Sequence, residues 1–227
     1  MAPLYIVATP IGHLQDITLR AVETLKTVDT IACEDTRHSG RLLAHLGISR
    51  PLISCRGQNT HRVLPRIIQL LQNDQAVAYI SDAGTPGISD PGSALVRGVR
   101  DAGFPVVPIP GASAFTALIS VSGVAGRGWF FEGFLPPKGE RRTTRLRELA
   151  QRGEPFVLYE SPHRIQKLFG ELCVAAAGFH VVLGREMTKI YEQIIEVSVE
   201  TGKEMVENGD IPTRGEFVLL VWSGKRR

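Results

Sequence analysis

Acidic and basic side chains cluster directly after three strand-like runs of this chain. The residues EDTR at 34–37 follow the apolar run 30–33, and YESPHR at 159–164 and REMTK at 185–189 also stand at the ends of strand-like runs. Carboxylates can remove protons in catalysis, and guanidinium and ammonium groups bind phosphate. Open α/β proteins bind ligands outside the carboxyl ends of their strands. These groups therefore predict a charged cleft at the strand ends of two domains.

Three turns made of small residues also follow strand-like runs. They lie at 9–12, 81–86 and 110–114, and the second belongs to the segment 81–92, which contains three Gly and two Pro. Small residues let a backbone approach a ligand closely. None of the turns matches GxGxxG or GxxxxGK[ST], so the specific signatures of a dinucleotide site and a P-loop are missing. If the strands are parallel, the three turns form one ligand crevice.

The elements that must position these turns alternate between strand and helix patterns in the first half of the chain. We expect a mostly parallel N-terminal sheet with helices on both faces over residues 1–123. Asp16 or Thr18 is expected to cap a helix with Leu19 on its apolar face, and Ser39 to cap the next. Asp90 and Pro91 are expected to start a later helix.

The pattern changes at the small residues 122–128, so a second α/β domain is expected over 124–227. Its strand signals are followed by short turns, which indicates a mixed sheet with antiparallel members. These signals lie at 129–134, 156–160, 181–185, 194–199 and 217–222.

Composition limits the class of protein. The three Cys are far apart, the six His show no helical metal spacing, and no apolar run approaches about 20 residues, the length of a membrane helix. We therefore expect a cytoplasmic protein without a metal site or membrane span. The formal charge of +3 permits an acidic partner. The basic run 138–152 could bind RNA phosphates or form the solvated face of a helix, and it has no interleaved aromatic residues for base stacking.

Ten motifs occur in an order typical of one family. Taken together, the chain resembles the ribosomal RNA small-subunit methyltransferase I family of the tetrapyrrole methylase superfamily over essentially its whole length. The motifs are TPIG at 9–12, DIT at 16–18, EDTR at 34–37, SDAGTP at 81–86, DPG at 90–92, PIPGASA at 108–114, EGFLP at 132–136, YESPHR at 159–164, REMTK at 185–189 and GEFV at 215–218.

The resemblance implies a two-domain tetrapyrrole methylase-like fold, a homodimer and S-adenosylmethionine bound in the cleft between the domains. The implied reaction is 2′-O-methylation of a cytidine ribose in the decoding region of 16S rRNA, within the 30S subunit. The cofactor contacts that carry over by motif are Pro10, Ile11, Asp82, Thr85, Ser113, Ala114, Tyr159, Met187, Gly215 and Glu216.

The charged strand ends supply the remaining site hypotheses. Glu34 or Asp35 is the expected general base, with Arg37 beside them. The side chains expected to hold RNA phosphate and ribose, together with Arg37, are His163, Arg164, Arg185 and Lys189.

The chain departs from the family pattern in two places, and two alternative functions are compatible with its sequence. Residues 56–59 read RGQN where the family usually has His-acid-His-Asn, so only Asn59 is kept and no substrate role carries over to that loop. The family usually continues past its last strand into a helical tail, whereas this sequence stops at Arg227, so either the gene lacks that tail or the sequence is truncated. A tetrapyrrole C-methylase would keep the cofactor and change the acceptor. A non-catalytic RNA-binding or assembly module would not need the cofactor.

Overall fold

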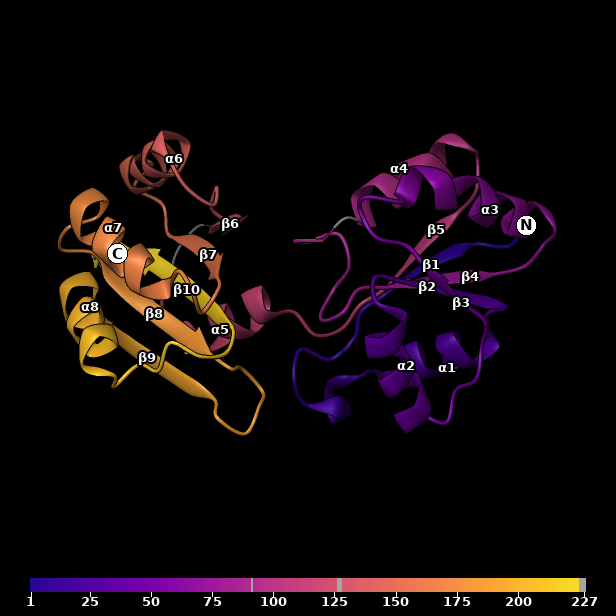
Figure 1. Ribbon diagram of the computed structural model, residues 1–227, viewed down its shortest axis with the longest axis horizontal. Helices are drawn as coiled ribbons and strands as arrows, with labels where there is room; N and C mark the ends of the chain where they lie inside the picture. Colours follow the sequence, from indigo (N-terminus) through magenta and orange to yellow (C-terminus); the bar gives the residue numbers. More distant parts are fainter. Residues whose placement is uncertain (91, 126–127, 225–227) are drawn as a thin grey trace. The chain divides into compact units, whose positions relative to one another are not determined.

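The computed structural model describes residues 1–90, 92–125 and 128–224. The expected first helical position, Pro91, lies outside the described residues, as do Gly126, Arg127 and residues 225–227. The chain divides into two compact units, Met1–Ser113 and Ala114–Arg227 (Figure 1), named here the N-terminal and C-terminal units.

The N-terminal unit is built on a five-stranded sheet in the order β3-β2-β4-β1-β5, in which every strand pair is parallel. β1 lies between β4 and β5, and β2 lies between β3 and β4, so the loops after β1, β2, β4 and β5 all leave the same edge. The strands are β1 (Leu4–Val7), β2 (Thr30–Cys33), β3 (Leu52–Ser54), β4 (Val77–Ile80) and β5 (Val106–Ile109). β2 and β4 are buried along their whole length, as expected for strands covered on both faces.

Helices cover both faces of this sheet (Figure 1). On one face α1 (Leu19–Thr27) and α2 (Thr36–His45) pack with Leu25, Leu43 and neighbouring residues on Ile31 and Ile80. On the other face α3 (Thr60–Gln72) and α4 (Gly92–Asp101) pack their apolar residues on the opposite side of β1, β2 and β4. A 3-10 turn, η1 (Leu14–Asp16), precedes α1.

Two local expectations about these helices are wrong. Thr18 caps α1, but Leu19 is 88% exposed, because Ala21, Thr24 and Leu25 form its buried face. Ser39 lies inside α2 and is buried, and the cap is Asp35, whose carboxylate accepts from the N–H groups of Arg37 and His38. Both Asp and Ser are good N-caps, so residue type alone did not decide between them.

The C-terminal unit has a mixed sheet in the order β6-β7-β10-β8-β9. β6 and β7 are parallel, and the other pairs are antiparallel. The strands are β6 (Phe130–Phe134), β7 (Phe156–Glu160), β8 (His180–Arg185), β9 (Gln193–Ser198) and β10 (Phe217–Trp222). The α/β fold class, with a parallel N-terminal sheet and a mixed C-terminal one, is confirmed.

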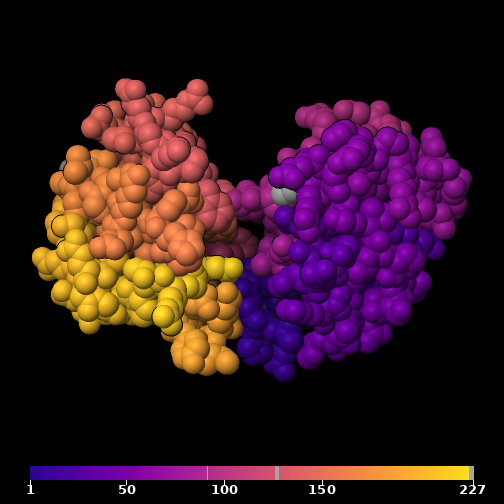
Figure 2. Space-filling view, in the orientation of Figure 1, coloured from indigo at the N-terminus to yellow at the C-terminus, as the bar shows by residue number. Residues whose placement is uncertain are grey.

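Four helices described in this unit complete its layers: α5 (Ala114–Ser122), α6 (Glu140–Gln151), α7 (Ile165–Ala175) and α8 (Val199–Asn208). α6, α7 and α8 share one apolar cluster with the sheet, whereas α5 contacts β8 and β10. α6 forms a ridge at the rim of this unit (Figure 2). The boundary predicted from the sequence, near residue 124, follows α5, whereas the compact units divide before it.

Gly202 of α8 faces the ring of Phe169 in α7 so closely that a Cβ atom would stand 2.4 Å from Phe169 Cε1. We expect Gly202→Ala to lower the free energy of unfolding by about 1–3 kcal/mol, because the buried ring has no free space to move into. Gly170→Ala in α7 is the matched control, since no atom lies within 4 Å of its added Cβ. There the helix propensity of Ala should raise stability by up to about 1 kcal/mol. Urea unfolding measures the free energy of unfolding of both variants, and equal changes in Gly202→Ala and Gly170→Ala would contradict the prediction.

Candidate active site

The three small-residue turns of the N-terminal unit are joined by main-chain hydrogen bonds. Thr9 and Gly84 form a short antiparallel bridge, with N···O distances of 2.9 and 3.1 Å. The Thr85 hydroxyl donates to the carbonyl of Ala112 over 3.0 Å, which ties in the third turn. The turns that follow β1, β4 and β5 therefore form one corner, named here the turn corner.

The backbones of the turn corner approach too closely for larger residues. Gly84 has φ +78°, and a Cβ there would lie 3.3 Å from Ile11 Cγ2. At Gly111 a Cβ would lie 2.9 Å from the Cβ of Ala8. Glycine fits both positions because it has no side chain, and at Gly84 also because it tolerates positive φ.

Among the predicted cofactor residues of this unit, Pro10 is buried, Ile11, Thr85 and Ser113 are half-buried, and Asp82 is exposed. The structure places all five in or directly beside the turn corner, on the loops after β1, β4 and β5. Such an edge, lined by main chain and small side chains, suits a small ligand.

An acidic cluster adjoins the turn corner at the ends of β2 and β4. The Asp35 N–H donates to Asp82 Oδ1 over 3.1 Å, and the Asp82 N–H donates to Glu34 Oε1 over 3.4 Å. Partial burial and the negative charges of Asp90 and Asp82 raise the pKa of Glu34. Burial also raises the pKa of Asp90, whose carboxylate accepts from the N–H groups of Gly87 and Gly92. Residue patterns could not reveal that Asp90 influences Glu34, because α2, β3, α3 and β4 lie between them in the chain.

Glu34 and Asp35 have different electrostatic environments although they are neighbours. Hydrogen bonds from the Arg37 and His38 N–H groups lower the pKa of Asp35, whereas the pKa of Glu34 is raised. The Asp35 side chain is occupied by helix capping and by an ion pair with Arg56 at 3.3 Å. Glu34 is therefore the stronger base of the two and the one less engaged by its neighbours.

Arg56 connects the loop after β3 to the acidic cluster. Its Nε donates to the Glu34 carbonyl over 2.9 Å, in addition to the ion pair with Asp35. Asn59 accepts from the Arg56 N–H over 2.7 Å and donates to the Ser54 carbonyl over 3.1 Å. The RGQN loop thus has a structural link to EDTR.

In the C-terminal unit, the loops before β10 and after β8 are tied together. Glu186 Oε1 accepts from Lys189 Nζ at 2.9 Å and from the Glu216 N–H at 3.0 Å, and Lys189 also pairs with the Glu216 carboxylate. Burial opposes ionisation of Glu186, but these donors outweigh it and lower its pKa. Gly215 has φ +94°, and a Cβ there would lie 2.4 Å from Glu186 Cγ.

Met187 lies between two residues with positive φ, Glu186 at 51° and Thr188 at 64°. Its side chain is buried beside Gly184, whose added Cβ would stand 2.7 Å from the Met187 sulfur. Non-glycine residues with positive φ are concentrated at functional sites. The predicted cofactor residues Met187, Gly215 and Glu216 thus belong to one constrained loop pair of this unit.

The YESPHR loop is held by a buried carboxylate. Glu160 has a fully buried side chain that accepts from Arg142 at 2.8 Å and from Arg164 at 2.7 Å. Arg142 is 1% exposed and also pairs with Glu171 at 2.7 Å. The Tyr159 hydroxyl accepts from the Phe115 N–H over 3.1 Å, next to Ala114.

The basic run 138–152 spans most of α6, and part of its charge is used inside the unit. Arg142 is buried, Arg145 pairs with Glu132 at 2.6 Å, and Arg152 lies over the Phe130 ring at 4.2 Å. The run therefore forms neither a continuous basic face for RNA nor a fully solvated helix face.

The predicted RNA-contacting residues of the C-terminal unit have differing surroundings. His163 is exposed, and Arg164 is held by Glu160 and Ser161. Arg185 donates to the carbonyls of Arg214 and Tyr191, and Lys189 pairs with carboxylates. Their roles toward RNA stay predictions.

Residues 1–90, 92–125 and 128–224 contain neither a metal-ligand cluster nor a membrane-spanning helix. No group of three or more His, Cys, Asp or Glu in these ranges is placed to hold a metal ion. None of the helices they form combines the length and apolar character needed to span a bilayer.

Comparisons with known proteins agree on a single family. The family model for Tetrapyrrole (Corrin/Porphyrin) Methylases matches residues 3–201. A curated relative from Borrelia garinii subsp. bavariensis, named ribosomal RNA small subunit methyltransferase I, is 44% identical, and the match covers 96% of this chain and 97% of the relative. The relative of the same name from Pasteurella multocida is 46% identical over 96% of this chain and 78% of its own length.

Solved structures support the fold. Cobalt precorrin-4 methyltransferase, a cobalamin biosynthetic enzyme, matches with a TM-score of 0.72 and 16% identity over 96% of this chain and 94% of its own. Uroporphyrin-III-C-methyltransferase from Thermus thermophilus matches with a TM-score of 0.66 and 17% identity over 98% and 95%. The chain belongs to the tetrapyrrole methylase family, in the branch of the ribosomal RNA small subunit methyltransferases I.

Proposed function

We propose that this chain is an S-adenosylmethionine-dependent rRNA methyltransferase that methylates the 2′-oxygen of a cytidine ribose in the decoding region of 16S rRNA. The observation that carries the proposal is the identity of 44–46% to relatives named ribosomal RNA small subunit methyltransferase I, over 96% of this chain. We further propose the 30S subunit as substrate, a homodimer as the working form and the cytoplasm as the location.

The turn corner fits the cofactor. Ile11 and Ala8 pack so closely on Gly84 and Gly111 that only small residues fit there, and the bridge between Thr9 and Gly84 fixes the backbone, so the corner offers a rigid main-chain surface to a ligand. When bound, S-adenosylmethionine supplies an electrophilic methyl group with a neutral thioether leaving group. We propose that Pro10, Ile11, Asp82, Thr85 and Ser113 hold it in the N-terminal unit. The contacts proposed for the C-terminal unit are Ala114, Tyr159, Met187, Gly215 and Glu216.

Glu34 is proposed as the general base that removes the proton of the ribose 2′-hydroxyl. Its raised pKa makes it a stronger proton acceptor than an ordinary carboxylate. Asp35 is assigned a positioning role, because its carboxylate caps α2 and pairs with Arg56. We propose that Arg37, at the first turn of α2, contacts an RNA phosphate, as do His163, Arg164, Arg185 and Lys189.

A tetrapyrrole acceptor is the second candidate, because solved relatives methylate such compounds. Those relatives are only 16–17% identical to this chain, whereas the relatives named for rRNA are 44–46% identical. The higher identity to the relatives named for rRNA therefore favours RNA over a tetrapyrrole as the methyl acceptor.

The test is methylation of 30S subunits purified from cells that lack the modification, followed by mass spectrometry of nucleosides from the rRNA. We expect one 2′-O-methylcytidine per subunit, dependent on S-adenosylmethionine. Methylation of a corrin precursor, with none of 30S subunits, would favour the second candidate. Failure to bind the cofactor in calorimetry would favour the non-catalytic RNA-binding module.

A further inference from the structure

Residues 36–73 contain six Arg and three His but no Asp or Glu. The whole chain has 26 Lys and Arg against 23 acidic residues, so the remainder has 20 basic and 23 acidic residues and a net charge of −3. The positive charge of the protein is therefore concentrated in one segment. Such a concentration is the electrostatic footprint of a polyanion-binding surface.

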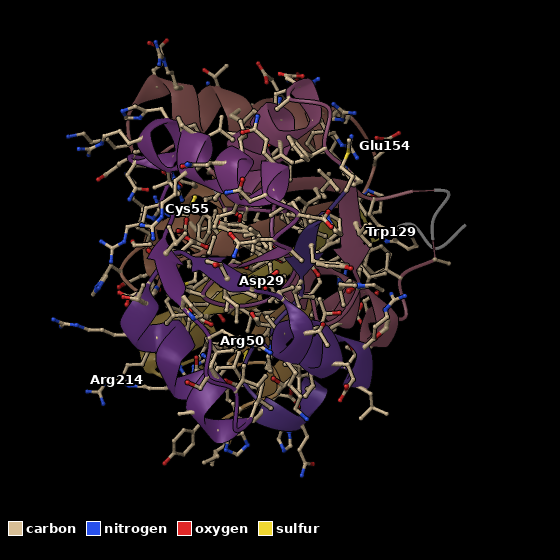
Figure 3. All side chains as sticks on the ribbon, turned by 90° about the vertical axis from the view of Figure 1, so that its right-hand side faces the viewer. Asp29, Arg50, Cys55, Trp129, Glu154 and Arg214 are labelled. Carbon is tan, nitrogen blue, oxygen red and sulfur yellow. The ribbon has the colours of Figure 1, made fainter. Side chains whose placement is uncertain are left out.

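The fold brings this segment to the edge of the sheet beside the acidic cluster. The segment consists of α2, β3 and α3, and β3 pairs in parallel with β2 through Ile31–Leu52 and Cys33–Ser54. In Figure 3, Asp29 precedes β2 and Cys55 follows β3, so they mark opposite ends of this strand pair. α2 and α3 both begin at the Cys55 end, where Glu34 also lies.

The arginines at this end are exposed and form few ion pairs within the protein. Arg37, Arg41 and Arg62 are exposed on the first two turns of α2 and α3. Within the part of the chain that the structure describes, the one ion pair made by residues 36–73 is Arg56–Asp35. On α6, by contrast, Arg142 and Arg145 are occupied by glutamates.

We propose that Arg37, Arg41, Arg56 and Arg62, named here the arginine edge, bind the phosphates of the RNA that flank the methylated nucleotide. The inference rests on the proposed function, because it names the surface that holds that substrate. Guanidinium groups match phosphate oxygens in geometry and charge. Arg56 also links the arginine edge to Glu34 and Asp35, so backbone binding and the proposed base share one rigid support.

The test compares two double variants that lose the same charge. Arg41→Gln with Arg62→Gln removes two members of the arginine edge. Arg97→Gln with Arg100→Gln is the matched control, because both residues are exposed on α4 of the same unit, beyond its first turn. The measurements are the Kd for 30S subunits between about 50 and 200 mM salt, the range over which phosphate contacts weaken strongly, and the Kd for S-adenosylmethionine.

We expect the Arg41/Arg62 variant to bind 30S subunits about tenfold or more weakly, with the slope of log K against log salt reduced by about 1–2. The control variant and the cofactor Kd should match the wild type. Unchanged affinity and slope in the Arg41/Arg62 variant, or equal losses in both variants, would overturn the proposal. Weaker binding without a change of slope would point to a protein partner and also overturn it. Wild-type protein that leaves 30S subunits unmethylated would instead refute the proposed function.

Discussion

Replacing Glu34 by Gln is expected to lower kcat for RNA methylation by about 10²–10⁴-fold, the usual contribution of a general base. The amide keeps the size of the side chain and can still accept from the Asp82 N–H, so the loop geometry and the cofactor Kd should be retained. In the wild type, activity should fall as the pH drops through the raised pKa of Glu34. This acid limb should be lost in the variant. Single-turnover rates over a pH series measure both effects.

The stability of the Glu34→Gln variant distinguishes loss of the general base from misfolding of the protein. The pKa of Glu34 is raised in the folded state, so its contribution to stability is present at low pH and decreases as the pH rises through that pKa. At neutral pH the Gln variant should therefore be at least as stable as the wild type.

Asp35→Asn is the matched control, because Asn is also a good helix cap and the substitution removes only the charge that pairs with Arg56. Its kcat should stay within about tenfold of the wild type, since one exposed ion pair contributes only about 0–1 kcal/mol. If Asp35→Asn loses activity and Glu34→Gln keeps it, Asp35 is the base. Near-normal rates in both variants would remove the cluster from the chemistry.

Replacing Arg142 by Met is expected to destabilise the C-terminal unit by about 3–5 kcal/mol, because it removes one partner from a buried ion pair. Glu160 is fully buried, and Arg142 also holds Glu171 and the Pro136 carbonyl. The free energy of unfolding in urea measures the loss.

Two variants test whether burial is the cause. Arg147→Met changes an exposed arginine of the same helix and should alter stability by no more than about 0.5 kcal/mol. Arg142→Met combined with Glu160→Leu also removes the buried carboxylate, which after the first change keeps only Arg164 as an ion-pair partner, and should recover part of the loss. A double variant as unstable as Arg142→Met alone would show that packing, and not the lost pairing of the Glu160 carboxylate, sets the effect.

Four strands of the N-terminal unit could be predicted because each is a short apolar run followed by turn residues, but β3 (Leu52–Ser54) was not predicted. In the C-terminal unit, the strands expected at 156–160 and 217–222 have the same bounds in the structure. The helix α8 was not predicted, since Gly202 interrupts its pattern for a packing reason that involves Phe169. Local residue patterns cannot reveal such a distant partner.

The charge of α6 is a second case in which local residue patterns could not reveal the partners of a side chain. Its arginines were compatible with an RNA surface or with the solvated face of a helix, and neither alternative anticipated that Glu132, Glu160 and Glu171 come from other elements and neutralise part of the charge. The absence of acidic residues over 36–73 was visible in the sequence, and only the fold explains its importance, because α2 and α3 begin together beside Glu34.

The bonds that join Thr9 to Gly84 run between main-chain atoms, so most substitutions at position 9 would leave them intact. The side chain of Thr9 can consequently diverge over evolutionary time without opening the bridge, provided that Gly84 persists. If the corner holds the methyl donor as proposed, a lineage could exchange one methyl acceptor for another by remodelling nearby loops while the corner stays unchanged.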